Sequence, residues 1–281
     1  MPKEQITLEQ INSMELPNLI QYAVPLILIL MVLEFFIITI KNKKKYEKKD
    51  FFASVGIGIG NVLIGAVIKV ASFAFIIFFY NLVPWQIPHT WWAYLLCFVV
   101  LDFCRYWAHR ISHEQRFWWA THVTHHSSEY LNWSTSFRVS WTQQIKLIFF
   151  IPIPLMGFDP IVFLVCHQIA VLFQFWVHTE VIPKLHPVFE YIFVTPSHHR
   201  VHHGKNQKYI DKNYGSTFII WDRMFGSFVE EDETPLYGIS KPVDSYNLIH
   251  LNFHEWIDIV KDVKKSKTWK ERYQNIFGKP K

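Results

Sequence analysis

The sequence is poor in cysteine and in charged residues, and each shortage argues against a class of protein. Only three of its 281 residues are cysteine, Cys97, Cys104 and Cys166, and all three lie in apolar stretches without pairing or metal-ligand spacing. This pattern disfavours a disulfide framework or a zinc ribbon and predicts small core residues instead. Charged residues make up 18% of the chain, compared with about 25% in soluble domains. An ordinary soluble domain is therefore disfavoured.

Apolar and aromatic residues take the place of the missing charge. Hydrophobic residues make up 51% of the chain and aromatic residues 17%, with 25 Phe and 12 Trp. This excess indicates that lipid is part of the solvent. The net charge is +5, but the lysines concentrate at 41–49 and 261–270, beside apolar segments rather than among base-stacking aromatics. We therefore expect anionic lipid headgroups as a partner, and no nucleic acid.

The first long apolar segment, 19–40, contains a single charged residue, Glu34. Its length suffices to cross a hydrocarbon core of ~30 Å. The preceding residues are acidic and no small-residue cleavage site follows, so we expect a retained membrane span rather than a secretory signal peptide. The next segment, 41–50, is rich in lysine. The positive-inside rule places it in the cytoplasm and residues 1–18 on the opposite, non-cytoplasmic side.

Further apolar segments predict the rest of the membrane topology. Residues 19–108 would form three spans, the second over 51–80 and the third over 92–107. The block 142–177, broken by a cluster of Pro and Gly, would form either a re-entrant hairpin or two tilted helices. The predicted fold is an all-α integral membrane protein with about four to five transmembrane or re-entrant helices and a cytosolic helical cap. The basic segment 231–281 would be cytosolic or lie on the lipid headgroups.

Histidine is the most informative residue type in the chain. There are 15 histidines, and nine of them fall in two short windows, 109–126 and 198–203. Helical residues three or four apart share a face. The motifs HRISH (109–113), HVTHH (122–126) and HRVHH (199–203) therefore each direct two or three imidazoles the same way. The predicted topology places both windows on the cytoplasmic side, of either a bacterial inner membrane or the endoplasmic reticulum.

So many imidazoles on a few helical faces indicate a site for two metal ions. Imidazole binds iron, copper, nickel and zinc, so the ligand type does not identify the metal. Zinc usually takes four ligands and a mononuclear non-haem iron site takes two histidines and a carboxylate, whereas eight or more histidines suffice for two ions. The predicted metal ligands are His109, His113, His122, His125, His126, His178, His198, His199, His202 and His203. Of these ten residues, His198 is the weakest candidate for a metal ligand because it is adjacent to His199.

Polar residues in phase with the histidines are candidates for supporting roles. Asp102 lies on the helical face of the first histidine motif, so its carboxylate could orient a ligand imidazole. The alternative is an interfacial carboxylate beside Arg105. His167, Gln174 and His178 share a face within an apolar block, and polar groups at membrane depth usually face a cavity or the protein interior. This stripe could line the route by which substrate reaches the metals.

Other classes of function remain open. Histidine clusters also occur in pH sensors, metal buffers and membrane metal-transport proteins. The helical phasing of the histidines, and their position beside the spans rather than within them, favour a catalytic site. A zinc hydrolase is disfavoured because HRISH lacks the glutamate of HExxH and no G-x-S-x-G motif occurs.

The motifs resemble those of the fatty acid hydroxylase/sterol desaturase superfamily of membrane di-iron enzymes. The resemblance spans 95–230 and rests on DFCRYWAHRISH (102–113), HVTHHSS (122–128), HTE (178–180) and PSHHRVHHGKN (196–206). Within the superfamily the chain is most similar to the alkylglycerol monooxygenase family, judged from HE (113–114), QFWVHTEVI (174–182) and DKNYGSTFIIWDRMFGSF (211–228).

This resemblance implies an oxidoreductase with two irons per chain that uses dioxygen to hydroxylate a lipid C–H bond, at the carbon beside the ether oxygen of glyceryl ether lipids. Electrons would come from a separate donor or a diffusible reductant, such as tetrahydrobiopterin. The histidines named above would bind the metals, and Glu114 would be an acidic residue required at the site. A desaturase or hydroxylase of sterols or fatty acyl chains on the same fold is the alternative.

Overall fold

The computed structural model describes residues 5–13, 16–41 and 46–280, and in these ranges the chain is helical with no β-strand. Two isolated bridges, Phe193 with Phe218 and Gly204 with Tyr237, are the β-type pairings among these residues. The helices are α1 (Leu8–Ser13), α2 (Leu19–Phe36), the π-helix η1 (Ile37–Lys41), α3 (Lys48–Asn81), α4 (Trp91–Glu114), α5 (Arg116–Trp119), α6 (Val123–His126), the 3₁₀ helices η2 (Trp133–Phe137) and η3 (Gln143–Phe150), α7 (Pro152–Leu155), α8 (Pro160–Trp176), α9 (Pro187–Ile192), α10 (Pro196–His203), α11 (Ile220–Met224), α12 (Leu248–Lys265) and α13 (Trp269–Phe277). The all-α prediction is confirmed.

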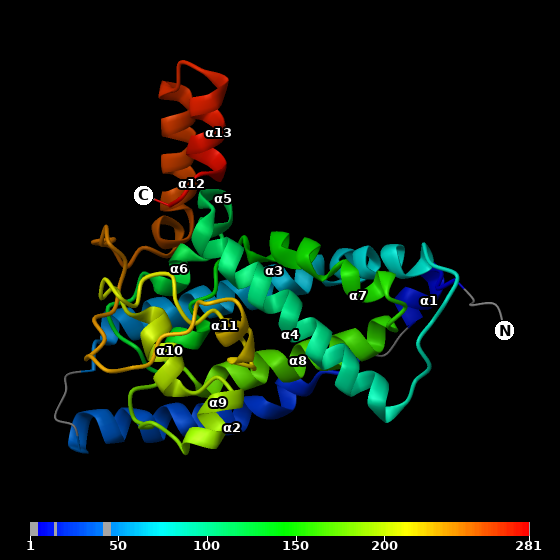
Figure 1. The fold of residues 1–281 in the computed structure, drawn as a ribbon, viewed down its shortest axis with the longest axis horizontal. Helices are drawn as coiled ribbons and strands as arrows, with labels where there is room; N and C mark the ends of the chain where they lie inside the picture. Colours follow the sequence, from blue (N-terminus) through cyan, green and yellow to red (C-terminus); the bar gives the residue numbers. More distant parts are fainter. Residues whose placement is uncertain (1–4, 14–15, 42–45, 281) are drawn as a thin grey trace.

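The long helices α2, α3, α4 and α8 extend along the long direction of the molecule (Figure 1). The short helix α1 lies at one end of this direction, and α6 and α10, which carry many of the histidines, lie toward the other. The C-terminal pair α12 and α13 stands out to one side, roughly across the direction of the long helices. The histidine-bearing helices are therefore gathered toward one end of the bundle.

Two helices are long and apolar enough to cross a membrane, over Leu19–Ile40 and Lys48–Asn81, and only 17% of the most apolar window in each is buried. An apolar helix that packs in a soluble core would be mostly buried, whereas these helices expose Leu26, Val62 and Val67 by more than half. The other predicted spans fall on α4 and α8, which are more polar or shorter. The number of crossings therefore stays a prediction.

The core between α4, η3, α7 and α8 sets the position of the histidines. Asp159 caps α8 by accepting a hydrogen bond from Ile161 N at 2.7 Å, and Pro160 occupies the first helical turn, where a missing N–H costs nothing. Buried side chains then join the four elements: Cys97, Leu101, Cys104, Phe150, Ile153, Phe158, Val162, Phe163, Cys166 and Ala170. All three cysteines are free and buried, as predicted. This packing brings the C-terminal halves of α4 and α8 together.

Two sets of buried hydrogen bonds connect α2 and α3 to the histidine-bearing end of the bundle. Glu34 of α2 is fully buried and accepts a hydrogen bond from Trp133 N at 2.7 Å and another from the Thr179 hydroxyl. Asp50, in the first turn of α3, accepts a hydrogen bond from the buried Arg138 guanidinium at 2.7 Å. Burial of a carboxylate is costly unless it is paired or hydrogen-bonded, so these contacts fix the C-terminal end of α2 and the N-terminal end of α3.

Several predictions of sidedness fall partly on residues that are not described. Residues 1–4 and 14–15 belong to the predicted non-cytoplasmic segment 1–18, and residues 42–45 belong to the lysine-rich loop 41–50; all of these lie outside the described residues. The assignment of both segments to sides of a membrane stays a prediction.

Candidate metal centre

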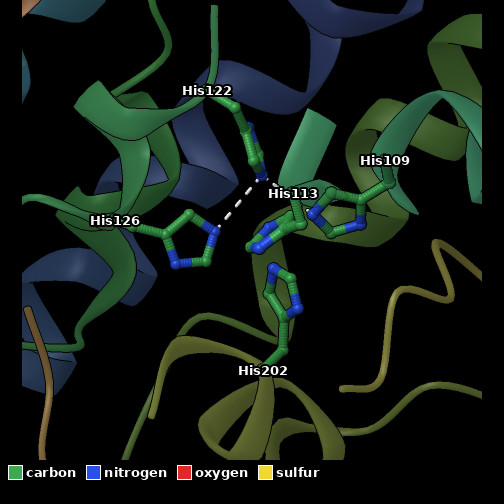
Figure 2. Close-up of side chains that lie close together, drawn as sticks. All are labelled: His109, His113, His122, His126 and His202. Carbon is green, nitrogen blue, oxygen red and sulfur yellow. Dashed lines mark hydrogen bonds between the residues drawn. The ribbon is translucent and has the colours of Figure 1, made fainter. Parts of the chain in front are cut away.

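Five imidazoles from three separate parts of the chain converge on one point (Figure 2). They are His109 and His113 from the end of α4, His122 and His126 from the turn into α6 and its last residue, and His202 from α10. One potential ligand nitrogen from each lies within 4.8 Å of the others. The Nε2 atoms of His109 and His122 are 2.8 Å apart, and those of His122 and His126 are 3.2 Å apart.

Four further imidazoles form a second cluster beside the first. They are His125 from α6, His178 from just beyond α8, and His199 and His203 from α10. The Nε2 atom of His178 lies 3.1 Å from that of His125 and 2.8 Å from that of His199. All four side chains are buried.

The two clusters adjoin through stacked rings. His126 of the first cluster stacks on His203 of the second with ring centroids 4.4 Å apart. Neighbours along the chain also divide between the clusters, since His125 faces one and His126 the other. The arrangement is thus a pair of adjoining sites whose side chains contact each other, as expected for two metal ions in one centre.

Burial lowers the pKa of all nine clustered imidazoles, and the positive charge that neighbouring groups would add contributes further for most of them. For His178 the pKa falls to about 4. The rings are therefore neutral at physiological pH. A neutral imidazole offers the nitrogen lone pair that metal binding requires.

Backbone carbonyls fix the orientation of three of the rings. His109 Nδ1 donates to Tyr214 O at 2.8 Å, His178 Nδ1 to Gln174 O at 2.6 Å, and His202 Nδ1 to Lys212 O at 3.0 Å. With the Nδ1 proton used in this way, Nε2 carries the lone pair and points into the cluster. Metal-binding histidines are normally held by such a hydrogen bond on the other ring nitrogen.

Two of these carbonyls belong to a turn with unusual backbone angles. Asp211 and Asn213 have φ of 58° and 53°, in the left-handed region that Asp and Asn tolerate best among residues other than Gly. The Asn213 side chain fixes the turn by accepting a hydrogen bond from Val229 N and donating one to Val229 O, both at 2.8 Å. The turn places the carbonyls of Lys212 and Tyr214 against His202 and His109.

A buried carboxylate that the sequence analysis did not single out supports this turn. Asp222 accepts hydrogen bonds from Tyr214 N and Gly215 N, each at 2.7 Å, and from the Ser227 hydroxyl at 2.7 Å. Burial raises the pKa of Asp222 to about 6, although these three donors oppose the rise. Asp222 thus acts on His109 indirectly, through the Tyr214 backbone. No periodic pattern links these residues, so sequence spacing gave no signal.

Asp102 does not orient a histidine in the way that its helical phase predicts. Its carboxylate accepts hydrogen bonds from Thr217 N at 2.8 Å and from Phe218 N and Trp221 Nε1, both at 3.0 Å. These contacts use both carboxylate oxygens, so Asp102 anchors the segment that follows the left-handed turn instead. Shared helical phase placed the carboxylate on the correct side of α4, but the nearby loop supplies better donors than the distant imidazole.

Two acidic side chains near the first cluster are partly exposed. Glu114 receives a hydrogen bond from Arg110 Nε at 2.8 Å and makes none with a clustered histidine. Asp211 lies closer, with a carboxylate oxygen 3.6 Å from His113 Nδ1. Both side chains are more than two-fifths exposed. The family resemblance implied Glu114 but not Asp211.

His198, the tenth predicted ligand, lies in neither cluster. Its Nδ1 accepts a hydrogen bond from Thr195 N at 3.3 Å and completes a capping box at the start of α10. Its ring contacts Phe228, with centroids 5.7 Å apart. Adjacent helical residues point about 100° apart, so His198 faces away when His199 faces inward. The geometry thus brings together nine of the ten predicted ligands.

The nine residues fit a metal centre by their chemistry and their spacing. Two imidazole nitrogens bound to one ion at about 2.1 Å and at right angles lie about 3 Å apart, and the short Nε2 separations in both clusters match this value. The Nε2 atoms of His113 and His202 are buried without a hydrogen-bond partner, which is costly unless a ligand occupies them. Each cluster could therefore hold a metal ion.

The fold and the clusters define a helical protein with apolar, membrane-type helices and two adjoining all-histidine sites. Residues 94–227 match the sequence model of the family described as Fatty acid hydroxylase, and this range contains every clustered histidine. This match agrees with the resemblance to the fatty acid hydroxylase family that the motifs indicate.

Known relatives extend the likeness beyond this range. The chain is 40% identical over 252 residues to alkylglycerol monooxygenase of Homo sapiens, covering 87% of this chain and 56% of the human protein. It is 41% identical over 243 residues to that of Xenopus tropicalis, covering 84% and 53%. It is 31% identical over 154 residues to the ornithine lipid hydroxylase OlsE of Rhizobium tropici, covering 50% and 44%. The chain spans about half the length of the curated relatives it matches, and no solved structure matches it.

Proposed function

We propose that this protein is a membrane-bound monooxygenase that holds two irons in its histidine clusters and hydroxylates the carbon beside the ether oxygen of a glyceryl ether lipid. The observation that carries the proposal is the convergence of nine imidazoles, seven of them buried and two partly buried, on two adjoining points. The similarity to alkylglycerol monooxygenases supports the choice of substrate. The reaction would convert R–H, dioxygen, two electrons and two protons into R–OH and water.

Each part of the chain has a distinct task in this proposal. The irons, when bound, would supply the activation of dioxygen. The histidines would hold them through Nε2, and the carbonyls of Tyr214, Gln174 and Lys212 would keep three of the rings in the required tautomer. Asp222 would hold the turn that carries Tyr214. Glu114 would act near the entrance, because its carboxylate is partly exposed beside the first cluster.

The proposed membrane arrangement takes its spans from the apolar segments of the sequence, and the position of the clusters toward one end of the bundle supports it. About four to five transmembrane or re-entrant helices would lie in the bilayer, three of them within 19–108 and the remainder in the hairpin 142–177. The catalytic domain, 95–230, would place its metal centre on the cytoplasmic side. Residues 231–281 would lie on the headgroups, where exposed Trp269 and Tyr273 would sit at the interface beside several lysines.

A membrane metal-transport protein is the rival from another class. Its histidines would follow a path through the bilayer, whereas the histidine-bearing helices α6 and α10 lie together toward one end of the bundle (Figure 1). A desaturase or hydroxylase of sterols or fatty acyl chains would use the same metal centre and differ in substrate.

The test is a reaction with isotopically labelled dioxygen. The purified full chain, loaded with iron, would be incubated with 1-O-hexadecylglycerol, ¹⁸O₂ and either tetrahydrobiopterin or another reductant. Hydroxylation beside an ether oxygen gives a hemiacetal that breaks down to hexadecanal and glycerol, so aldehyde should form in step with reductant use. An unlabelled double bond in an acyl lipid would favour desaturation. A chain that binds one zinc and no iron would contradict the oxygenase proposal.

A further inference from the structure

One buried arginine joins two of the three segments that supply the four-histidine cluster. Arg200 lies on α10 directly after His199 and is 7% exposed. Its Nη1 donates hydrogen bonds to the backbone carbonyls of Thr179, at 3.2 Å, and of Ile182, at 2.7 Å. Thr179 directly follows His178 in the chain. A side chain on the helix of one clustered histidine therefore binds the backbone beside another.

The segment that carries His178 lies outside the helices on either side of it. It connects the end of α8 to the start of α9, so no helical hydrogen-bond ladder fixes its path. The hydrogen bond from His178 Nδ1 to Gln174 O fixes the imidazole relative to α8. It does not fix the imidazole relative to α10, which supplies His199. The two hydrogen bonds from Arg200 connect the segment to α10 directly.

A carboxylate holds the guanidinium in the orientation that these hydrogen bonds need. Glu231 accepts hydrogen bonds from Arg200 Nε at 2.7 Å and from Nη2 at 2.8 Å, one on each carboxylate oxygen. Both side chains are mostly buried. Such a two-pronged pair is stronger and more directional than a single hydrogen bond. Because Nε and Nη2 are bound to Glu231, Nη1 is the nitrogen that faces the two carbonyls.

The backbone around Glu231 is itself fixed on both sides. Before it, Val229 N donates to the side-chain oxygen of Asn213, and Val229 O accepts from the amide nitrogen of the same side chain, both at 2.8 Å. After it, Glu233 N donates to the hydroxyl of the fully buried Tyr209 at 2.7 Å. The carboxylate that orients Arg200 is thus held in place by contacts that do not involve the guanidinium.

This set of contacts requires a guanidinium rather than any positive charge. Arginine carries five N–H groups in a planar fork, and Arg200 uses three nitrogens to reach one carboxylate and two carbonyls. Lysine carries its three N–H groups on one nitrogen, which cannot lie opposite both carboxylate oxygens and both carbonyls at once. A lysine at this position would leave part of the set without a donor, and an unsatisfied buried carbonyl is costly.

We propose that Arg200 is a positioning residue for the metal ion of the four-histidine cluster, because it fixes His178 and His199 relative to each other. Their Nε2 atoms are 2.8 Å apart, which is the separation that two imidazoles on one ion need. The inference rests on the metal centre of the proposed function and not on its substrate. The five-histidine cluster takes no ligand from the segment after α8, so the effect of Arg200 should fall on one cluster of the two.

The test is a cobalt(II) titration of the metal-free full chain in detergent. Imidazole sites take up cobalt, and its visible absorption reports the number and geometry of its ligands. His199→Ala and His202→Ala identify which binding step belongs to which cluster. Arg116→Gln is the matched control, because Arg116 is also buried and pairs with Glu255 and Asp262, at 2.6 and 2.7 Å, but connects α5 to α12. The other variants are Arg200→Gln, Arg200→Lys and Glu231→Gln.

Arg200→Gln should weaken the binding step of the four-histidine cluster by about 10–100-fold and shift its absorption bands, while the step of the five-histidine cluster stays unchanged. Arg200→Lys should not restore the weakened step, since the charge alone is not sufficient. Arg116→Gln should lower the melting temperature but leave the bands and the affinity of the four-histidine cluster as they are. If Arg200→Gln weakens both steps equally, or leaves the bands unshifted, its role is only structural and the inference is wrong.

A double variant tests whether Glu231 acts through Arg200. Glu231→Gln alone should weaken the same binding step less than Arg200→Gln does, and the double variant should be no weaker than Arg200→Gln. Additive losses would overturn the role assigned to Glu231. Two binding steps in the natural protein, without a selective effect of Arg200→Gln, would overturn the inference and leave the proposed metal centre intact. A natural protein in which no cobalt step depends on His199 would contradict the proposed metal centre itself.

Discussion

The carboxylate of Glu34 accepts a hydrogen bond from the hydroxyl of Thr179, the residue that directly follows His178. Glu34 lies within the first apolar helix, 145 positions earlier in the chain, and is fully buried. Its second oxygen accepts a hydrogen bond from Trp133 N at 2.7 Å. The one charged residue of the first predicted span thus holds the segment that carries a clustered histidine. This contact gives the apolar helix α2 a direct part in positioning the histidine clusters.

Replacing Glu34 by leucine should destabilise the protein and weaken the second cluster. The change leaves Trp133 N–H and the Thr179 hydroxyl buried without their acceptor, at a cost of about 1–3 kcal/mol each. Glu34→Gln keeps one acceptor oxygen of similar shape and should lose less. Thermal unfolding in detergent, with iron content measured on the same samples, checks both effects. Equal stability of the leucine variant and the natural protein would show that the contact has no energetic role.

Single ligand changes should remove one metal ion and not two. His202→Ala opens the five-histidine cluster and His199→Ala opens the four-histidine cluster, so each variant should retain close to one iron per chain. His198→Gln should retain two, because His198 caps α10 and faces neither cluster. Iron analysis of the purified variants distinguishes these cases. Loss of iron in His198→Gln, with helix content unchanged, would contradict the geometric assignment.

Asp222→Asn should lower metal affinity without touching a ligand. The asparagine side chain has one acceptor oxygen, whereas Asp222 serves Tyr214 N, Gly215 N and the Ser227 hydroxyl. The Tyr214 carbonyl would then hold His109 less firmly. Outer partners of metal-binding histidines typically affect metal affinity by about 10–100-fold. Competition with a chelator measures the change, and Asp258→Asn, at an exposed position on α12, provides the control.

The sequence could predict which histidines converge, because each motif obeys a local helical period. It could not predict how they divide. His125 and His126 are neighbours in the chain, yet they face different clusters, and so do His199 and His202. This division depends on the angles at which α6 and α10 approach α4. Those angles follow from long-range packing, which spacing does not encode.

The contacts of the supporting carboxylates, Asp222 and Asp102, could not be predicted from the sequence for a different reason. Asp222 acts on His109 only through the Tyr214 backbone, whose N–H it binds and whose carbonyl accepts a hydrogen bond from His109. Asp102 accepts hydrogen bonds from a loop more than a hundred residues later in the chain. A side chain that acts through the backbone leaves no periodic signal. The left-handed residues Asp211 and Asn213 are of types that tolerate this conformation, which is the one local hint that the turn is there.

Labelling from one side of the membrane should test the proposed topology. All three native cysteines are buried, so a cysteine introduced at an exposed position reports on its own site. In sealed right-side-out cells, an impermeant maleimide should label Glu9→Cys directly and Lys241→Cys only after permeabilisation, because 1–18 and 231–281 are expected on opposite sides. Labelling of both sites before permeabilisation, in cells that exclude a cytoplasmic marker, would contradict the arrangement.

Acidification should destabilise the metal-free protein below about pH 6.5. Burial holds the pKa of the clustered histidines below the ordinary value of 6.5. Above pH 6.5 the imidazoles are neutral in both the folded and the unfolded chain, so their contribution to stability is fully present. As the pH falls, the unfolded chain takes up protons that the folded chain does not, and folding stability declines. The melting temperature of the metal-free protein should therefore stay level above about pH 7 and fall as the pH drops from about 6.5 to 5.5, and the metal-loaded protein should release metal over the same interval. A melting temperature that rises or stays level on acidification would mean that the rings are already charged in the folded state, which would be incompatible with nine imidazoles acting as ligands.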